Sequence, residues 1–241
     1  MPIQYNTIQV MRYLYILFAF LILSWSTPAQ DYKKAREKMV TEQISKRGIK
    51  HNHTLDAMRK VERHLFVPPG YMRMAYDDGP MPIGYGQTIS QPYIVAYMTE
   101  IIKPKSGDKI LEIGTGSGYQ AAILAEIVDK VYTIEIVSEL ANAASERLQK
   151  LGYDNVEVIS GDGYYGLEEE APFDAIVVTA ASEHIPPSLT QQLKDGGKMV
   201  IPVGSPFLVQ TLMLVEKKGG KISTSSLMPV RFVPFTRSRK E

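Results

Sequence analysis

The sequence contains no cysteine, and this absence removes several kinds of site at once. Without cysteine the chain can form no disulfide, no thiolate metal site and no cysteine nucleophile. Cysteine-free chains occur in reducing and oxidising compartments alike, so the compartment stays open. The four histidines, at positions 51, 53, 64 and 184, show no zinc-ligand spacing, and we predict no metal site.

An excess of charge of one sign is also missing. The 27 lysines and arginines almost balance 26 acidic residues, which leaves a formal net charge of +1. Such a chain has no summed field to draw it onto a polyanion, so nucleic acid is not an expected partner. With 241 residues, of which 44% are hydrophobic, the length and composition suit one compact domain.

Long apolar runs are scarce, and the exception lies at residues 13–25. This run follows Arg12 and leads into small residues at 26–29, which is typical of a signal peptide. It is short of the roughly 20 residues that span a bilayer, yet a tilted or uncleaved anchor stays open. So does a start of translation at Met11 or Met39. The positive flank just beyond favours a cytoplasmic body, and consists of Lys33, Lys34, Arg36 and Lys38.

The first part of the body predicts short helices and a loop. Charged and apolar residues alternate at helical spacing over residues 31–48, and a second helix is expected over 54–63 with Thr54 as its N-cap. Residues 77–86 are too rich in glycine and proline for a regular element, which predicts a shaped functional loop. A third helix is expected over 90–102, with Ser90 as a candidate N-cap.

From residue 109 onward, β-rich runs alternate with helical stretches. This pattern predicts a mostly parallel, doubly wound α/β sheet. Strands are expected at 109–113, 131–136, 156–160, 175–179 and 198–203, and helices at 118–127, 138–151 and 187–193. The last two runs, 209–216 and 222–233, flank a glycine turn and predict an antiparallel hairpin at the C-terminal edge of the sheet. The earlier helices would cap this sheet from the N-terminal side.

The glycine-rich turn at residues 114–118 joins the first strand to a helix, and in such folds ligands bind at this edge of the sheet. Glycine permits positive φ and close approach, and a helix N-terminus favours an anion. A dinucleotide fingerprint would need glycine where Tyr119 stands, and no P-loop lysine follows. The Gly-x-Gly-x-Gly spacing after Leu111-Glu112-Ile113 resembles that of Rossmann-like S-adenosylmethionine methyltransferases.

Two carboxylates follow the next two strands. Glu135 closes the second strand, where a carboxylate can accept hydrogen bonds from both ribose hydroxyls. Asp162 follows the third, where the resembled methyltransferases hold the adenine amine. Each has a simpler explanation, since Glu135 could be a solvated strand-end residue and Gly-Asp-Gly is ordinary turn chemistry. Three such features at three successive strand ends favour the cofactor interpretation.

The segment Gly84-Tyr85-Gly86-Gln87-Thr88-Ile89-Ser90-Gln91-Pro92-Tyr93 closely resembles the signature of the protein-L-isoaspartate O-methyltransferases. The resemblance spans roughly residues 35–237 and continues through residues 111–122, 173–181, 196–204 and 231–236. It implies methyl transfer from S-adenosylmethionine to the free α-carboxylate of L-isoaspartyl residues in damaged peptides and proteins. The ester then collapses to a succinimide, whose hydrolysis partly restores aspartate. Only the N-terminal leader departs from the family, which is typically soluble and cytosolic.

The chemistry suits the residues, because a carboxylate with a pKa near 3.5 is already ionised and needs no general base. The resemblance assigns Ser90 to the active site, where its hydroxyl would orient the carboxylate. Its alternative role is the helix cap. Residues 77–85 would clasp the substrate main chain. The expected cofactor-binding residues are Thr88, Ile89, Glu112, Gly114, Gly116, Ser117, Gly118, Glu135, Ile136, Asp162, Gly163 and Thr236.

The predicted organisation is a signal-like or anchor segment, 1–29, before a single methyltransferase domain, 30–241. That domain would comprise N-terminal helices and substrate loop (31–104), cofactor core (105–204) and C-terminal hairpin (205–241). We expect a cytoplasmic monomer, because S-adenosylmethionine is made in the cytosol; an exported or tethered form is the alternative, with membrane contact only through 1–29. The rival functions are methylation of a small molecule or RNA, and a catalytically silent binding module.

Overall fold

The computed structural model describes residues 28–238 of the chain. By its internal contacts the chain divides into a short unit, residues 1–35, and a large unit, residues 36–241. The predicted signal-like segment lies outside the described residues except for its last two, which begin helix α2 (Pro28–Lys38). None of the helices formed by residues 28–238 is long and apolar enough to cross a membrane.

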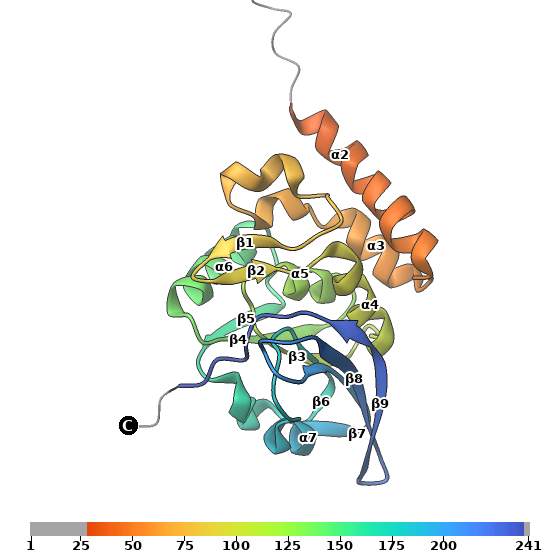
Figure 1. Ribbon diagram of the computed structural model, residues 1–241, viewed down its shortest axis with the longest axis vertical. Coiled ribbons are helices and arrows are strands. Elements are labelled where there is room, and N and C mark those ends of the chain that lie inside the picture. Colours follow the sequence, from red (N-terminus) through yellow and green to blue (C-terminus); the bar gives the residue numbers. More distant parts are fainter. Residues whose placement is uncertain (1–27, 239–241) are drawn as a thin grey trace, which may run out of the picture. The chain divides into compact units, whose positions relative to one another are not determined.

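A seven-stranded sheet forms the centre of the large unit (Figure 1). Its strands are β3 (Lys109–Ile113), β4 (Lys130–Glu135), β5 (Val156–Ser160), β6 (Phe173–Val178), β7 (Leu193–Val203), β8 (Gln210–Lys218) and β9 (Lys221–Val230). The order is β5-β4-β3-β6-β7-β8-β9. The first five strands in this order are parallel to one another. Strand β8 runs antiparallel to β7, and β9 runs antiparallel to β8. The predicted sheet and its antiparallel edge hairpin are therefore confirmed.

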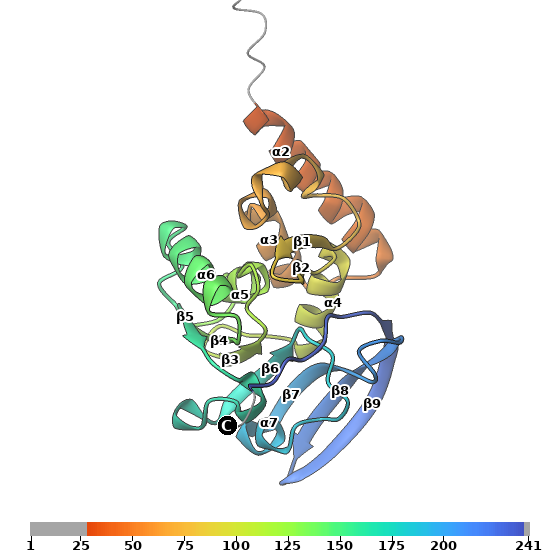
Figure 2. The same cartoon turned by 60° about the vertical axis from the view of Figure 1, so that its left-hand side comes forward.

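Helices cover both faces of the sheet (Figure 2). On one face lie α4 (Pro92–Ile102), α5 (Tyr119–Ala125) and α6 (Ser138–Lys150), and on the other lies α7 (Pro187–Gln192). The central strands read as continuous apolar runs because both of their faces are buried. One core cluster is built on alternate residues such as Leu111 and Ile113, and includes the side chain of Leu189 from α7.

Two strand boundaries differ from the prediction by three residues or more. Strand β7 begins at Leu193 rather than Lys198, because its first residues pair with β6 through an irregular register. The two glycines that follow Leu193 do not fit a strand pattern, so the sequence did not predict this start. Strand β9 ends at Val230 rather than Val233. The backbone of Val233 leaves the sheet and accepts a hydrogen bond from the amide of Ala181, 2.8 Å away. That pairing draws the C-terminal segment back toward the end of β6.

The helical run predicted over residues 31–48 is present, but only its first part is an α-helix. A π-helix (Met39–Ile44) and a 3-10 turn (Ser45–Arg47) follow α2, and Gly48 ends them with φ 101°. Helix α3 covers Asn52–Lys60, so the prediction that Thr54 caps it is wrong. Two 3-10 segments follow, Arg63–Phe66 and Pro69–Met74.

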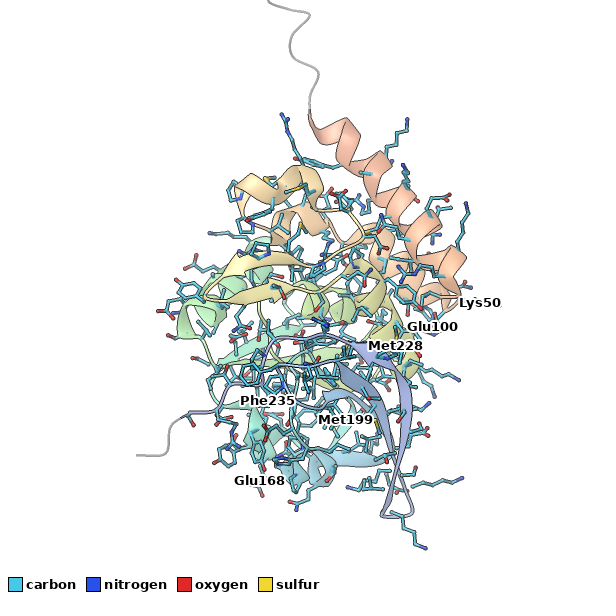
Figure 3. All side chains as sticks on the ribbon, in the orientation of Figure 1. Lys50, Glu100, Glu168, Met199, Met228 and Phe235 are labelled. Carbon is cyan, nitrogen blue, oxygen red and sulfur yellow. The ribbon has the colours of Figure 1, made fainter. Side chains whose placement is uncertain are left out.

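Thr54 lies inside the first turn of α3, fully buried, with its hydroxyl 3.1 Å from Nδ1 of His51. The chain entering α3 is held instead by Glu100 of α4. Its carboxylate accepts hydrogen bonds from the backbone amides of Lys50 and His51 at 2.8 and 3.1 Å (Figure 3). A long-range partner of this kind leaves no local signal in the sequence.

The predicted irregular loop contains regular structure. Strands β1 (Met81–Gly84) and β2 (Gln87–Ile89) form a separate two-stranded antiparallel hairpin. Its turn residues, Tyr85 and Gly86, both have positive φ, 53° and 71°, as hairpin turns of the primed types require. Proline is tolerated in β1 because this short strand pairs on one side only. The prediction that residues 77–86 hold no regular element was therefore wrong.

Candidate active site

A cavity lies at the carboxyl ends of the parallel strands. It is lined by the residues that end β3, β4 and β6, by the turn after β5, by β2 and by the C-terminal segment 233–236. Carboxyl ends of neighbouring parallel strands meet at one edge of a sheet, which is where ligands bind in this class of fold. The cavity therefore brings together segments from positions 87 to 236 of the chain.

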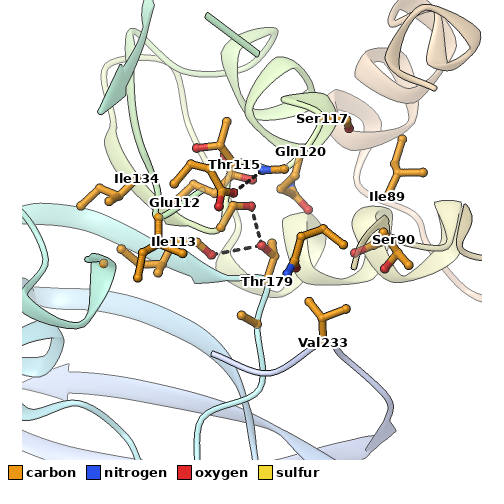
Figure 4. Close-up of a pocket in the computed structure, with 18 of the residues that line it drawn as sticks. Ile89, Ser90, Glu112, Ile113, Thr115, Ser117, Gln120, Ile134, Thr179 and Val233 are labelled. Atoms are coloured by element: carbon orange, nitrogen blue, oxygen red, sulfur yellow. Dashed lines mark hydrogen bonds between the residues drawn. The ribbon is translucent and has the colours of Figure 1, made fainter. Parts of the chain in front are cut away.

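The glycine loop forms the floor of this cavity between β3 and α5. Gly114 and Gly116 have φ of 98° and 52°, a region that side chains with a Cβ rarely adopt. A Cβ on Gly114 would lie 2.4 Å from Oγ1 of Thr179. The Thr179 hydroxyl donates toward the carbonyl oxygens of Ile113 and Gly114, at 3.0 and 2.7 Å (Figure 4). The hydrogen bonds from Thr179 thus fix the loop, and the loop has no room for a larger residue at position 114.

Glu112 is the most deeply buried carboxyl group of the site, with no exposed surface. One oxygen, Oε2, accepts a hydrogen bond of 2.6 Å from Thr133, whose hydroxyl also contacts that of Thr115 at 2.7 Å. The other oxygen, Oε1, has no hydrogen-bond partner among residues 28–238. Burial raises the pKa of Glu112 to about 8, aided by the charge of Glu135 and opposed by the Thr133 hydrogen bond. Glu112 is therefore mostly protonated at neutral pH and can donate or accept a hydrogen bond at the cavity wall.

Glu135 ends β4 and is 5% exposed. Its Oε2 accepts a hydrogen bond from the backbone amide of Gly116 at 2.8 Å, and its Oε1 accepts one from Val137 at 2.9 Å. Each carboxylate oxygen can accept more than one hydrogen bond. The carboxylate therefore ties the glycine loop to β4 and keeps acceptor capacity toward the cavity that it lines.

Asp162 is one of two predicted site residues that do not line the cavity. Its Oδ1 accepts from the amide of Tyr164, and its Oδ2 accepts from Nε of Arg237 and from the amide and hydroxyl of Ser238, all within 3.0 Å. Burial raises the pKa of Asp162, but these hydrogen bonds outweigh it and hold the pKa below its usual value. The carboxylate thus fastens the C-terminal segment, and its neighbour Gly163 lines the cavity instead.

Ser90 lines the cavity as predicted, and it is half-buried. The prediction that it caps α4 is wrong, because the helix begins at Pro92 and the N-cap position belongs to Gln91. Within residues 28–238 no other residue hydrogen-bonds the Ser90 hydroxyl; its carbonyl oxygen accepts from Nη2 of Arg63 at 2.8 Å. The hydroxyl is therefore available to a bound molecule.

Arg63 lies behind the site, where it supports Ser90, and was not predicted from the sequence. Its guanidinium is fully buried, donates through Nε to the carbonyl of Ala75 at 2.7 Å, and lies 4.8 Å from the ring centre of Tyr119. Burial lowers its pKa to about 10, so it stays charged at neutral pH. Arg63 thereby joins Ser90 to the first residue of α5, just after the glycine loop. Nothing in the local sequence distinguishes it from a surface arginine.

A second groove opens beside the cavity. Four residues line both: Thr88, Ser90, Thr179 and Val233. The groove is also lined by α4, by residues 228–232 at and after the end of β9, and by Arg47 and Val209. The shared residues mark the place where a molecule in the cavity and a molecule in the groove would touch. Figure 4 shows Ser90, Thr179 and Val233 around this place.

Comparison with known proteins identifies the family. The family model described as protein-L-isoaspartate(D-aspartate) O-methyltransferase matches residues 34–240. The chain belongs to this family. A protein-L-isoaspartate O-methyltransferase from Nitrosospira multiformis is 59% identical over 86% of this chain and 89% of its own length. One from Opitutus terrae is 56% identical over 91% and 96%.

Two solved structures of proteins named as protein-L-isoaspartate O-methyltransferases share the fold. One has a TM-score of 0.76 and 29% identity, and covers 83% of this chain and 65% of the other. The second, from Plasmodium falciparum, was solved in complex with S-adenosyl-L-homocysteine; it has a TM-score of 0.72 and 28% identity, and covers 86% and 99%. The Rossmann-like methyltransferase fold predicted for the chain is thereby confirmed.

The predicted site residues fall into two groups, those that line the cavity and those that do not. Of the predicted catalytic and cofactor-binding residues, all but Gly118 and Asp162 line the cavity. Gly118 instead caps α5 with φ 84°, and a Cβ there would lie 3.1 Å from Leu148. The lining residues missed from the sequence include Gln120 and Thr179. The position of Thr179 at the end of a predicted strand was the available signal for it.

Proposed function

We propose that the protein transfers the methyl group of S-adenosylmethionine to the free α-carboxylate of L-isoaspartyl residues in damaged peptides and proteins. The observation that carries this proposal is the junction between the cavity and the groove at Thr88, Ser90, Thr179 and Val233. A methyl donor in the cavity and a peptide in the open groove would meet there. Family membership supplies the chemical identity of both partners.

The cavity suits S-adenosylmethionine on three grounds. The glycine loop leaves room for close approach of a ligand to the backbone, since Gly116 carries no side chain and has positive φ. Glu135 retains acceptor capacity for the two ribose hydroxyls. The unpartnered Oε1 of Glu112 needs a hydrogen-bond partner from the ligand, such as the amino group of the methionine moiety.

When bound, S-adenosylmethionine supplies a methyl group on a positively charged sulfur, which a carboxylate can accept by in-line displacement. The residues of the protein need not act as a base, because the substrate carboxylate is ionised near neutral pH. Ser90 would orient the substrate carboxylate by donating a hydrogen bond from its free hydroxyl. The side chains at the junction would exclude water and hold the carboxylate in line. The backbone amide nitrogen of the following residue then attacks the methyl ester and displaces methanol, which gives the succinimide that begins repair.

We propose that Gly163, which lines the cavity, lies against the adenine, and that Asp162 reaches the adenine amine when its hydrogen bonds to Arg237 and Ser238 open. The remaining predicted cofactor residues, Thr88, Ile89, Ser117, Ile136 and Thr236, would enclose the ligand as cavity-lining residues. We further propose one methyltransferase domain, 30–241, after a separable segment 1–29.

We place the activity in the cytoplasm, where S-adenosylmethionine is made, and propose that the enzyme acts as a monomer. The nearly balanced charge argues against nucleic acid as a partner. Membrane contact would come only from residues 1–29. Cell fractionation combined with N-terminal sequencing of the mature protein tests these statements. Recovery of a cleaved form outside the cytoplasm would contradict the cytoplasmic assignment.

Transfer of labelled methyl groups to a matched pair of peptides tests the function. We expect a base-labile methyl ester on the isoaspartyl peptide and none on the aspartyl peptide. Cofactor binding without any ester would indicate a silent binding module. Label that appears only in small molecules or RNA from a cell extract would indicate a methyltransferase of another specificity. Either result would overturn the proposal.

A further inference from the structure

The groove beside the cavity has an uneven charge. As far as residues 28–238 form it, its lining contains two arginines, Arg47 and Arg231, and no aspartate or glutamate. Arg47 is already satisfied, because its Nη1 lies 3.1 and 3.0 Å from the two carboxylate oxygens of Asp78, and its guanidinium lies 3.7 Å from the ring centre of Tyr93. It serves to hold the wall of the groove together.

Arg231 differs from Arg47 in having no side-chain partner in the described part of the chain. It is exposed, and within residues 28–238 no hydrogen bond or ion pair joins its side chain to another residue. The backbone around it is fixed, since Val230 ends β9 and the amide of Phe232 donates to Oε1 of Gln210 at 2.9 Å. An anchored backbone thus presents a free guanidinium to a groove without acidic residues.

The position of Arg231 limits what it can bind. Arg231 lines only the groove, whereas Val233, two residues later, lines both groove and cavity. Two extended residues span about 7 Å. If the reacting carboxylate of a peptide lies at Ser90, a guanidinium this far from the junction can bind a second carboxylate. That second carboxylate would lie one or two residues along the peptide. Arginine binds carboxylates through two parallel hydrogen bonds, which favours it for this task.

We propose that Arg231 is a specificity-determining residue that binds a second carboxylate of the substrate next to the isoaspartyl residue. That carboxylate is either an acidic side chain or the C-terminus of a short peptide. The inference rests on the proposed function and adds a preference to it. Damaged segments that carry a neighbouring acidic group are methylated ahead of neutral ones.

Peptides that differ only beside the isoaspartyl residue test this inference. The set carries glutamate, glutamine or lysine at the adjacent position, before or after it, with amidated C-termini; a fourth has glutamine and ends in a free carboxylate. We expect the wild-type enzyme to favour the glutamate peptide over the glutamine peptide by about fivefold in kcat/KM, the size of one favourable exposed ion pair. A gain with the fourth peptide alone would assign the second carboxylate to the C-terminus. The preference should shrink as salt is added.

Variants of Arg231 separate a direct contact from a general field. Arg231→Gln should bring the glutamate-to-glutamine ratio to about one through KM, and Arg231→Glu should favour the lysine peptide. Arg73→Gln removes the same charge from an exposed site outside both cavities and should keep the wild-type ratio. Equal losses on all peptides in Arg231→Gln, or an unchanged ratio, would overturn the inference. Failure of the proposed function is distinct, since then the wild type would methylate no isoaspartyl peptide.

Discussion

The two halves of the site are built from different kinds of structure. The cofactor cavity rests on the ends of β3, β4 and β6, whose residues are almost all buried and whose loop is fixed by Glu135 and Thr179. The groove beside it is bounded by the margin of a short hairpin, the start of α4 and the chain leaving β9. These elements are half-buried or exposed, and several are irregular.

The difference reflects the two ligands. A cofactor of constant shape is best held by a preformed, buried frame. A damaged peptide has variable side chains, so its groove must be open and must read the backbone near one carboxylate. We therefore expect changes in the cavity frame to cost stability and cofactor affinity, and changes in the groove to alter peptide turnover alone.

The largest effect should come from Gly114→Ala. The new Cβ would meet Oγ1 of Thr179 at 2.4 Å, in a backbone conformation that already disfavours alanine, so we expect a loss of about 3 kcal/mol in unfolding free energy. Gly152→Ala is the control, because its φ is also positive, 80°, but its Cβ would meet nothing within 4 Å. It should cost about 1 kcal/mol. Urea unfolding measures both, and equal losses would contradict a tightly packed frame.

Next comes the pH dependence of stability through Glu112. Its pKa is about 8 in the folded protein, against about 4.5 for a glutamate in the unfolded chain. As pH rises through this window the unfolded chain loses the proton while the folded protein keeps it, so wild-type stability falls. Glu112→Gln removes this effect. Its stability relative to wild type should rise on the order of 2 kcal/mol from pH 5 to pH 8.

Urea unfolding at several pH values measures this change. Gly152→Ala, which changes no titratable group, is the control and should keep the pH profile of the wild type. A Glu112 variant that follows the wild-type pH profile would mean that Glu112 is ionised in the folded protein.

Ser90→Ala tests the groove side of the junction. Loss of the orienting hydroxyl should lower kcat/KM for an isoaspartyl peptide about tenfold to thirtyfold, with stability and cofactor affinity retained. Ser226→Ala, on the exposed face of β9, should behave as wild type. An unchanged rate in Ser90→Ala would leave the serine a purely structural role.

Glu135→Ala tests the cavity side. Removal of the carboxylate leaves the amides of Gly116 and Val137 unpaired and deletes the expected ribose acceptor, so cofactor affinity should fall about tenfold in calorimetry. Glu157→Ala, at an exposed carboxylate on β5, should retain affinity. Unaltered binding in the Glu135 variant would mean that the ribose lies elsewhere.

The smallest effect should come from the C-terminal fastening. Arg237 pairs with Asp162 and lies 3.5 Å from the ring centre of Tyr164, but its side chain is 38% exposed. Arg237→Gln should raise both the association and dissociation rates of the cofactor about threefold, as befits an exposed ion pair. Stopped-flow binding measures this, with Arg59→Gln, on α3, as control. Unchanged rates would show that cofactor entry does not need this segment to open.

The sequence predicted the cavity better than the groove. The β-rich runs, the glycine spacing and Glu135 all lie within one βαβ stretch, where local periodicity fixes how residues are arranged. The prediction from sequence failed where contacts between distant parts of the chain decide where a helix begins. Thr54 and Ser90 have the chemistry of helix caps, yet α3 is held by Glu100 and α4 begins two residues after Ser90. Proline and glycine likewise concealed the hairpin β1–β2.

By itself the sequence determined the parallel sheet, its antiparallel edge, the glycine loop and the acidic residues at the strand ends, because each depends on neighbours a few residues apart. Only the tertiary structure decided that Asp162 holds Arg237 and Ser238, that Arg63 supports Ser90, and that the groove meets the cavity at Ser90 and Val233. These contacts join residues far apart in the chain. Their geometry is set by how the finished sheet positions its loops, and local patterns carry no record of it.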